Sequence, residues 1–407
     1  RTVLRCAAFV AIGLLACPTF PRAETILATG ATFGDQTAEG RREETPFVLR
    51  LQDGQWSTAA LPENATFRLE GAVFSSPSTA WAYGTTADSR AIILQSTDTG
   101  RTWKVAEGIS DDVLSGRRPV AIAFPSKSFG VLVMVGMTGM GPYLLVTRDG
   151  GVSWDDAGGT RFSAFGRYFL TADSAVPELV RVDEYGARCA KLDSLVSTGL
   201  QADDLLDPAS SSGSLVLGSS AGGGFVHLPE LDAEYIAGDD PFWPRAVSAA
   251  QDRVWIAGML TWGGRRPSES AIFQSAGGCG PWQRQETPSE GIAMIEALHL
   301  RDKDSGIAGG REQRDAGTGV FLLYTSNGGS PWQRATLPDG LTSKDLTVRS
   351  VVRGDDEGGW AVIHDRAGVT TTFLSTSDSG ASWKSVPTGF EQNTYVWSLA
   401  RGSELPE

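Results

Sequence analysis

The chain has 407 residues, of which 41% are hydrophobic and 20% charged, and its formal net charge is −13 at pH 7. This apolar content suffices for a sizeable core and excludes a chain that is disordered throughout. The acidic balance argues against a general nucleic-acid binder, because an acidic surface repels phosphate. With 49 Gly and 12 Trp, the composition favours short strands joined by tight turns. The 3 His and 4 Cys leave few metal ligands, so we expect no metal and no other cofactor.

The chain begins with a segment typical of an export signal. Residues 1–16 carry two arginines and then an apolar run that is too short to span a bilayer. The stretch Leu-Leu-Ala-Cys at 14–17 looks like a bacterial lipobox, in which Cys17 is lipidated. The alternative is ordinary signal-peptidase cleavage after Ala23. We therefore expect a signal peptide (1–16), a linker (17–24) and a folded domain (25–407) of an exported protein, either a periplasmic or outer-membrane lipoprotein or a secreted protein.

The folded domain starts with three predicted strands, at 25–30, 46–51 and 56–61. They have the character of the second, third and fourth strands of a sheet that lacks its first strand. The segment 395–400, at the other end of the chain, has the character of a first strand without the rest. Pairing the two ends would complete this sheet and remove its free edges.

Between these ends, pairs of apolar β segments recur, and the second segment of a pair usually ends on Gly. They are predicted at 71–74 with 80–84, 120–124 with 130–136, 246–248 with 254–258, 295–300 with 306–309, and 348–352 with 360–363. A third apolar segment follows most pairs, and after it comes a polar octapeptide that ends in Trp. The repeating unit is therefore four antiparallel strands with the octapeptide between the third and the fourth.

The octapeptide has the frame S/T-x-D/N-x-G-x-S/T-W and is predicted to be a structural hairpin turn. A short Asp or Asn side chain accepts hydrogen bonds from nearby backbone N–H groups, Gly supplies the positive φ of the reversal, and Trp covers the turn. We expect these side chains to be structural rather than catalytic or calcium-binding. The frame residues are Asp98, Gly100 and Trp103; Asp149, Gly151 and Trp154; Asn327, Gly329 and Trp332; and Asp378, Gly380 and Trp383.

The spacing of the octapeptides predicts a β-propeller. The Asp position recurs at 53, 98, 149, 277, 327 and 378, so most steps are 45–51 residues long. A four-stranded unit of this length buries its faces only against neighbouring units, which is typical of propeller blades. The gap between 149 and 277 leaves room for two degenerate units, with candidate turns at 184–186 and after His227. We expect eight blades, with seven as the alternative if the middle pair is one blade.

These octapeptides resemble the Asp-box, or BNR repeat, of sialidase-type propellers. The whole unit, with its Trp-Ala-Tyr-Gly second strand at 81–84, is similar to the photosystem II stability and assembly factor family. The resemblance covers about residues 25–400 as architecture. It implies that the Asp-box is structural and lies on the face opposite the binding site. Fold does not imply function, so the resemblance leaves the activity open.

A sialidase would be expected to carry three arginines that clamp a carboxylate, a Tyr–Glu nucleophilic pair and an acidic Asp. The segment Phe-Val-Leu-Arg that ends at Arg50 lacks the Arg-Ile-Pro motif of that family. Tyr235 directly follows Glu234, and neighbours on a strand point to opposite faces. Tyr395 is a further candidate nucleophile without a supporting arginine frame. His227, His299 and His364 fall in three different units, which argues against a shared metal site.

The loops between the second and third strands, and those between successive units, emerge opposite the octapeptide turns. We expect a partner-binding face there, because arginines gather in these loops although the chain is acidic. Acidic residues in the same loops offer the alternative of a solvated rim. Our hypothesis is a monomeric, non-enzymatic scaffold or assembly factor that binds a protein in the cell envelope; the alternative is a glycan-binding or sialidase-like glycoside hydrolase propeller. The candidate binding residues are Arg90, Arg117, Arg118, Trp262, Arg265, Arg266, Arg311, Arg314 and Arg366.

Overall fold

A computed structural model gives the fold of the chain. It describes residues 25–36, 42–63, 66–124, 127–136, 143–159, 167–171, 178–183, 186–191, 217–219, 222–224, 242–250, 253–260, 269–276, 282–288, 292–312, 319–341, 345–354, 356–365, 370–390 and 392–402. The expected signal peptide, linker and Cys17 lie outside these residues.

The described residues form strands and one short helix. In the first half they are β1 (Ile26–Gln36), β2 (Arg42–Gln52), β3 (Gln55–Thr58), β4 (Phe67–Phe74), β5 (Ala80–Thr86), β6 (Ala91–Ser96), β7 (Lys104–Val105), α1 (Asp111–Leu114), β8 (Arg117–Ala123), β9 (Gly130–Gly136), β10 (Tyr143–Thr147), β11 (Asp155–Gly159), β12 (Arg167–Thr171), β13 (Glu178–Asp183) and β14 (Gly186–Lys191). In the second half they are β15 (Leu217–Ser219), β16 (Gly222–Gly224), β17 (Phe242–Ala250), β18 (Arg253–Leu260), β19 (Glu269–Ala276), β20 (Gln283–Arg284), β21 (Ile292–Leu300), β22 (Gly306–Glu312), β23 (Val320–Thr325), β24 (Gln333–Arg334), β25 (Leu346–Arg353), β26 (Gly359–Asp365), β27 (Thr370–Thr376), β28 (Lys384–Val386) and β29 (Thr394–Arg401).

The protein is all-β, with several four-stranded antiparallel sheets, as the sequence predicts. The four-stranded sheets are β4–β7, β8–β11, β17–β20, β21–β24, β25–β28 and the sheet ordered β29-β1-β2-β3. In each of the first five, the strands lie side by side in chain order. In the sixth, β29 from the end of the chain pairs antiparallel with β1, with Ala31 opposite Tyr395 and Ile26 opposite Arg401.

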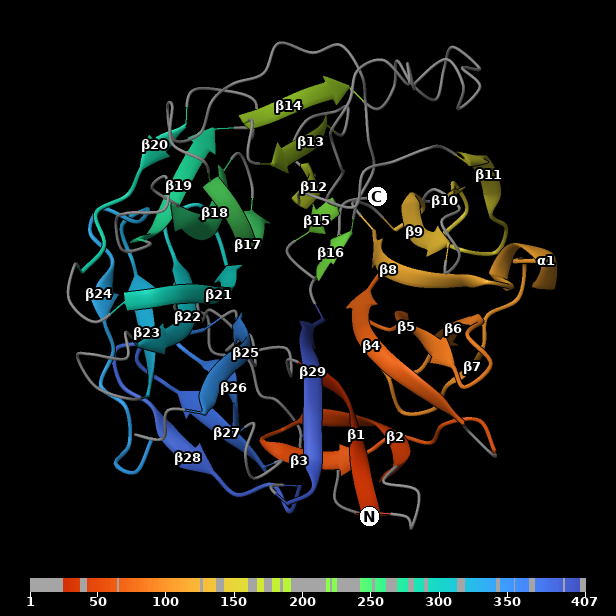
Figure 1. Cartoon of the computed structure of the whole chain (residues 1–407), viewed down its shortest axis with the longest axis horizontal. Coiled ribbons are helices and arrows are strands. Elements are labelled where there is room, and N and C mark those ends of the chain that lie inside the picture. The colour runs from red at the N-terminus through yellow and green to blue at the C-terminus, as the bar shows by residue number, and fades with distance from the viewer. Residues whose placement is uncertain are drawn as a thin grey trace, which may run out of the picture.

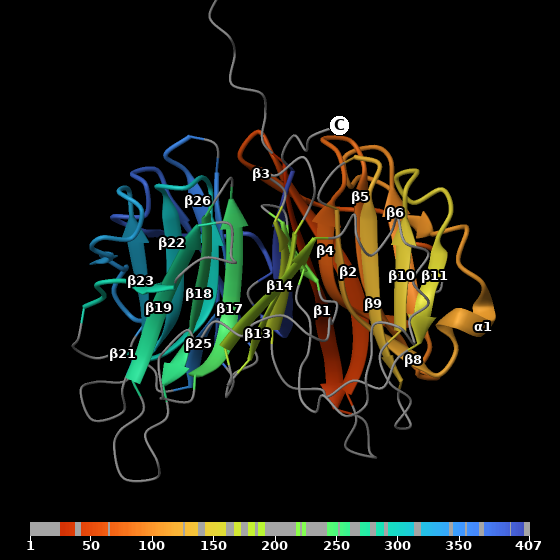
Figure 2. The same ribbon diagram turned by 90° about the horizontal axis from the view of Figure 1, so that it is seen from above.

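The sheets are arranged around a common centre, with the first strand of each innermost (Figure 1). Successive first strands contact one another: β29 contacts β4, β4 contacts β8, β17 contacts β21, and β21 contacts β25, which contacts β29. The smaller sheets β12–β14 and β15–β16 lie between the β8–β11 and β17–β20 sheets, because β16 contacts β8 and β12 contacts β17. In the side view, β9–β11 lie on one side of the molecule and β17–β19 on the other (Figure 2).

The turn predicted at 184–186 falls between β13 and β14, and Gly186 is the described residue of it. In the described part of this sheet the strand order is β12-β13-β14, so the turn joins the last two described strands. The other candidate turn, after His227, lies outside the described residues.

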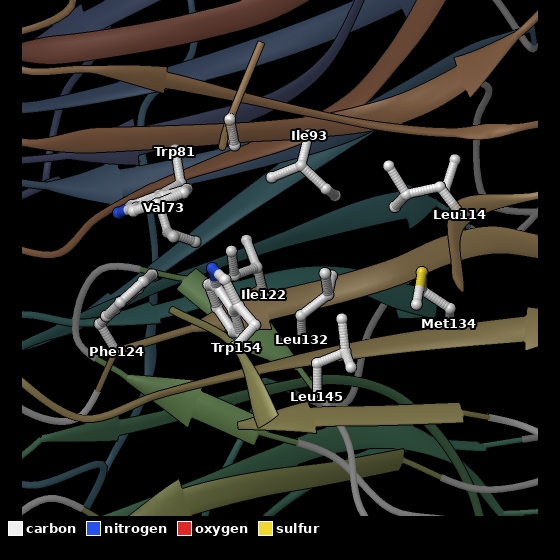
Figure 3. Packing of buried hydrophobic residues seen from close by; sticks show 12 residues of the cluster. Val73, Trp81, Ile93, Leu114, Ile122, Phe124, Leu132, Met134, Leu145 and Trp154 are labelled. Atoms are coloured by element: carbon white, nitrogen blue, oxygen red, sulfur yellow. The ribbon is translucent and has the colours of Figure 1, made fainter. Parts of the chain in front are cut away.

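The core lies between the faces of neighbouring sheets. Between β4–β7 and β8–β11 it contains Trp81, which is fully buried, and Phe124 stacked on it with ring centroids 5.4 Å apart (Figure 3). The octapeptide Trp154 meets Trp81 edge-on at 5.8 Å. A Cβ atom at Gly151 would lie 2.2 Å from the Trp81 ring, so this glycine permits the close contact of the two sheets. The octapeptide glycine therefore serves the packing of neighbouring units as well as its own turn.

Candidate functional site

The octapeptide turns hold carboxylates that could in principle bind calcium or act in catalysis. Asp98 Oδ1 accepts hydrogen bonds from Ser96 Oγ (2.8 Å) and from the backbone N–H groups of Arg101 (3.0 Å) and Thr102 (2.9 Å). Its Oδ2 accepts the Thr102 hydroxyl at 2.7 Å. Trp103 closes the turn by donating its indole N–H to the Gly100 carbonyl at 3.1 Å. Both carboxylate oxygens are thus engaged within the turn.

The other turns repeat this pattern. Asp149 and Asp378 accept the backbone N–H of Ser153 and Ser382, each at 2.9 Å. Asn327 accepts the Thr325 hydroxyl at 2.8 Å and donates to the Ser330 carbonyl at 2.6 Å. The Ser153 hydrogen bonds lower the pKa of Asp149 to about 2. In the described part of the chain, no group of three or more His, Cys, Asp or Glu side chains is placed to hold a metal ion.

Three of the four predicted arginines that the structure describes have partners in their own chain. Arg90 forms a 2.8 Å ion pair with Asp111 in α1. Arg117 donates to the carbonyls of Asp112 and Val113, and so caps the end of that helix. Arg311 pairs with Glu296 at 3.0 Å. Arg118 is exposed near the start of β8, without an ion pair to any described residue. The candidates outside the described residues are Trp262, Arg265, Arg266, Arg314 and Arg366.

A different set of side chains gathers on the innermost strands, at one repeated irregularity. In each of six inner strands the pairing with the next strand slips by one residue, which is a β-bulge. In β4, for example, Leu69 is opposite Gly84 and Gly71 is opposite Tyr83, so Glu70 is the extra residue. The extra residues at the equivalent positions are Glu70, Val120, Arg245, Glu296, Arg349 and Trp397. We call these six residues the bulge ring.

At three of the six bulges, a glycine of the neighbouring strand leaves room for the bulged backbone. A Cβ atom at Gly84 would lie 1.9 Å from the Arg68 carbonyl oxygen, and one at Gly310 would lie 1.8 Å from that of Met294. Gly30, facing the bulge of β29, would meet the Tyr395 carbonyl oxygen at 2.2 Å. The bulged strand approaches its neighbour so closely that a side chain at these facing positions would collide with backbone.

The bulge ring lies at the ends of the strands away from the octapeptide turns. Gly84, next to the bulge of β4, pairs with Ile92 near the start of β6, whereas Asp98 follows the end of β6 at Ser96. The ring is therefore on the side where the sequence predicts the binding face. Its members are on strands in the centre rather than in the surrounding loops.

The part of the ring with the most contacts is centred on Trp397. The guanidinium carbon of Arg68 lies 3.9 Å from the Trp397 ring centroid, and that of Arg349 lies 5.8 Å from it. These arginines come from β4 and β25, the inner strands on either side of β29. Both are exposed, and neither forms an ion pair with any described residue. Tyr395 packs against the same indole at 4.0 Å.

Glu70 and Tyr83 extend this cluster into the β4–β7 sheet. The Tyr83 ring lies over Gly71, because a Cβ there would be 2.5 Å from the phenol oxygen. Burial and, next, the negative charge of Glu70 raise the pKa of Tyr83 above its ordinary value, while Arg349 acts in the opposite direction. The phenol therefore stays protonated at neutral pH. No hydrogen bond joins Tyr83 to Glu70, both of which the structure describes.

The described histidines tie neighbouring sheets together. His364 Nε2 accepts the Val396 backbone N–H of the next sheet at 3.0 Å, and its ring contacts Tyr395 at 3.7 Å. His299 Nδ1 accepts the Arg353 backbone N–H at 3.2 Å, which joins β21 to β25. Each imidazole thus has a structural bond across a sheet boundary. His227 lies outside the described residues.

The sialidase-type candidates do not come together in the described part of the structure. Arg50 is buried and donates its Nε to the Thr99 carbonyl at 2.8 Å, inside the first octapeptide turn. It is therefore on the opposite side from Tyr395 and the bulge ring. Glu234 and Tyr235 lie outside the described residues. Within the described residues, no helix is long and apolar enough to cross a membrane.

The comparisons with known proteins bear on the fold. No protein-family model matches the chain, and no curated protein matches it. Among solved structures it is similar to a GH74 enzyme of Niastella koreensis, with a TM-score of 0.52 and 15% identity over 89% of this chain and 55% of that one. It is also similar to a putative 6-phosphogluconolactonase of Bacteroides fragilis, with a TM-score of 0.51 and 11% identity over 95% and 99% of the two chains.

These likenesses support a β-propeller. The chain spans about half the length of the GH74 enzyme, 55% of that chain. A structure of YCF48 with D1 peptide bound is a weaker match, with a TM-score of 0.44 and 15% identity over 83% of this chain and 91% of that one. At such identities similarity concerns the fold alone, and one fold supports many activities.

Proposed function

We propose that this protein is a non-enzymatic β-propeller that binds a protein partner at the bulge ring. The observation that carries the proposal is the cluster of exposed Arg68 and Arg349 around the half-buried Trp397, which three neighbouring sheets build together. Trp and Arg are the side chains that most often dominate protein-binding energy. The two arginines have no carboxylate partner among the described residues, although the chain as a whole carries a net charge of −13.

The proposal includes the finer architecture. The pairing of β29 with β1 supports a closed ring in which the two ends of the chain share a blade. Eight blades follow if β12–β14 and β15–β16 are separate units, and seven follow if they belong to one. In the same proposal the protein works as a monomeric scaffold or assembly factor in the cell envelope, exported by residues 1–16 and held at the membrane by lipid on Cys17.

The alternative function is a glycan-binding or sialidase-like glycoside hydrolase, and one observation favours it. Tyr83 lies near Glu70 with Arg68 and Arg349 close by, which is part of the combination expected of a sialidase, without its third arginine and its acidic Asp. Two features weigh against it. The raised pKa of Tyr83 disfavours the phenolate that a nucleophile requires. Arg68 also occupies one face of the Trp397 ring, which a stacked sugar would otherwise use.

Partner capture from a solubilised envelope extract tests the proposal. The bait is the mature protein, compared with the double variant Arg68→Ala/Arg349→Ala and with Lys384→Ala as a matched control. Lys384 is an exposed residue of β28, on the outer side of the sheet that contains Arg349. We expect the double variant to lose the captured protein and the control to retain it, while circular dichroism shows all three folded. If the double variant captures as much of the partner as the wild type does, the binding site is not at the bulge ring.

A fluorogenic sialoside tests the alternative in parallel. Turnover by the wild-type protein that disappears in Tyr83→Phe and persists in Lys384→Ala would establish the hydrolase instead. Tyr83→Phe removes the hydroxyl and keeps the ring over Gly71, so it separates chemistry from packing. We expect no turnover by any of these proteins.

A further inference from the structure

We infer that the bulged residue of each inner strand is the specificity-determining position of this site, and that the present set selects an acidic peptide segment. The inference rests on the proposed function, which it deepens by naming the positions that choose the partner and the chemistry they choose. It has two steps, one about the backbone and one about charge.

The fold determines where the bulge occurs but does not determine which side chain the bulged residue carries. The bulge recurs at the same level in six sheets, yet its residues are Glu, Val, Arg, Glu, Arg and Trp. A bulged residue has no directly opposite partner, so ladder pairing places little demand on its side chain. The demand falls instead on the facing strand, where Gly30, Gly84 and Gly310 leave room for backbone carbonyls. At these three bulges stability depends on the facing glycine, whereas Arg349 faces Ile363 and Val362. Recognition can depend on the bulged residue itself.

Around Trp397, the bulge ring and its neighbouring residues carry an excess of positive charge. Arg349 is a bulge residue, and Arg68 is separated from the bulge residue Glu70 by Leu69 alone. Glu296, the bulge residue of β21, is neutralised by Arg311 at 3.0 Å. Beside Trp397, two exposed guanidinium groups thus face a single unpaired carboxylate, that of Glu70.

An acidic peptide fits this arrangement better than other ligands. Arg forms planar, bidentate hydrogen bonds with carboxylates. The net charge of −13 disfavours acidic segments elsewhere on the molecule, so their binding would be confined to such a cluster. Because Arg68 lies on the Trp397 ring, a carboxylate can be held between the guanidinium groups without displacing an aromatic contact.

A charge-swap experiment tests both steps. Isothermal titration calorimetry measures binding of a Glu-rich octapeptide, its Gln counterpart and its Lys counterpart to the whole mature protein. The variants are Arg349→Glu and, as the matched control with the same change of charge, Lys384→Glu on the outer strand of the same sheet. Thermal unfolding is measured for both, together with Gly84→Ala, which adds a side chain opposite a bulge.

We expect the wild type to bind the Glu peptide, with binding that weakens in salt, and not to bind the Gln peptide. Arg349→Glu should weaken Glu-peptide binding at least tenfold and gain binding of the Lys peptide, whereas Lys384→Glu should change it less than twofold. Both should melt as the wild type does, and Gly84→Ala should melt well below it. A bulge substitution that unfolds the protein, or equal effects of the two charge reversals, would overturn the inference.

The failure of this inference is distinguishable from failure of the proposed function. If the partner is captured through Arg68 and Arg349 but no Glu peptide binds, the inference is wrong and the proposed function stands. If an acidic oligosaccharide binds at the ring and the acidic peptide does not, the inference is also wrong. If partner capture does not depend on the ring at all, the proposed site is wrong and the inference falls with it.

Discussion

Replacing Asp98 by Ala measures how much one octapeptide turn contributes to stability. The carboxylate accepts four hydrogen bonds at 2.7 to 3.0 Å, two of them from backbone N–H groups. A net bond contributes about 0.5–1.5 kcal/mol, and values near the lower end apply here because exposed donors can bind water instead. We therefore expect Asp98→Ala to lower the free energy of unfolding by about 2 kcal/mol. Asp98→Asn should lose about half as much, because an amide oxygen can still accept, as that of Asn327 does.

The loss should also depend on pH. Burial opposes the charge of Asp98, but hydrogen bonds from Thr102, Ser96 and Arg101 outweigh it and lower the pKa from 3.8 to about 2. Because the folded pKa is below the unfolded one, the stabilisation is complete above about pH 4 and is lost as the pH falls toward 2. The difference between wild type and Asp98→Ala should accordingly shrink across this range.

Urea unfolding followed by tryptophan fluorescence, at pH 7 and again at pH 3, gives both quantities. The control is Glu63→Ala, which removes an exposed carboxylate outside the turns. We expect the control to match the wild type at both pH values. The reasoning is refuted if Asp98→Ala unfolds at the same urea concentration as the wild type at pH 7, or if its deficit is as large at pH 3 as at pH 7.

Three further predictions concern the packing. Gly151→Ala should lower the free energy of unfolding by more than about 3 kcal/mol, because its Cβ would lie 2.2 Å from the Trp81 ring at a φ of +92°. Gly54 also has a positive φ but lies in open space, so Gly54→Ala should cost about 1 kcal/mol in the same urea titration. His364→Ala should lower the melting temperature, because the Val396 N–H loses its acceptor and a buried ring is removed; a variant that melts like wild type would contradict the tie between sheets. Arg117→Ala should speed hydrogen exchange in α1, whose end Arg117 caps, without changing exchange in β4–β7; unchanged exchange would show that the cap is dispensable.

Much of the fold could be predicted from the sequence, because its signals are local. Each octapeptide contains its own turn, with Asp98, Gly100 and Trp103 bonded to one another or to adjacent residues. The glycines predicted at the ends of the second strands, such as Gly84, could also be recognised in the sequence. The bulge that requires glycine there could not be predicted, because it depends on how an inner strand fits against its neighbours around the centre.

The site was harder to predict for the same reason. The sequence predicts the site from arginines in loops. The ion pair of Arg90 with Asp111, which occupies one of these arginines, joins residues of different units and forms only in the folded chain. Arg68 and Arg349 lie in mostly apolar strands that are far apart in sequence. The available signal was a charged residue that recurs in the first strand of the unit, as in Glu70, Glu296 and Arg349. Their convergence on Trp397 requires the ring arrangement to be known.

Because β1 pairs with β29, the sheet that contains both strands is completed only late in synthesis. β1 is among the first strands to leave the ribosome, and its partner β29 begins at Thr394, close to the end of the chain. Until then β1 has an open edge of unpaired backbone groups, which is a site for association with other chains. A chain that stops before Thr394 keeps that edge open however well its other sheets form. Completion of this sheet therefore depends on the segment that begins at Thr394, and copies truncated before it remain targets for proteases and aggregation.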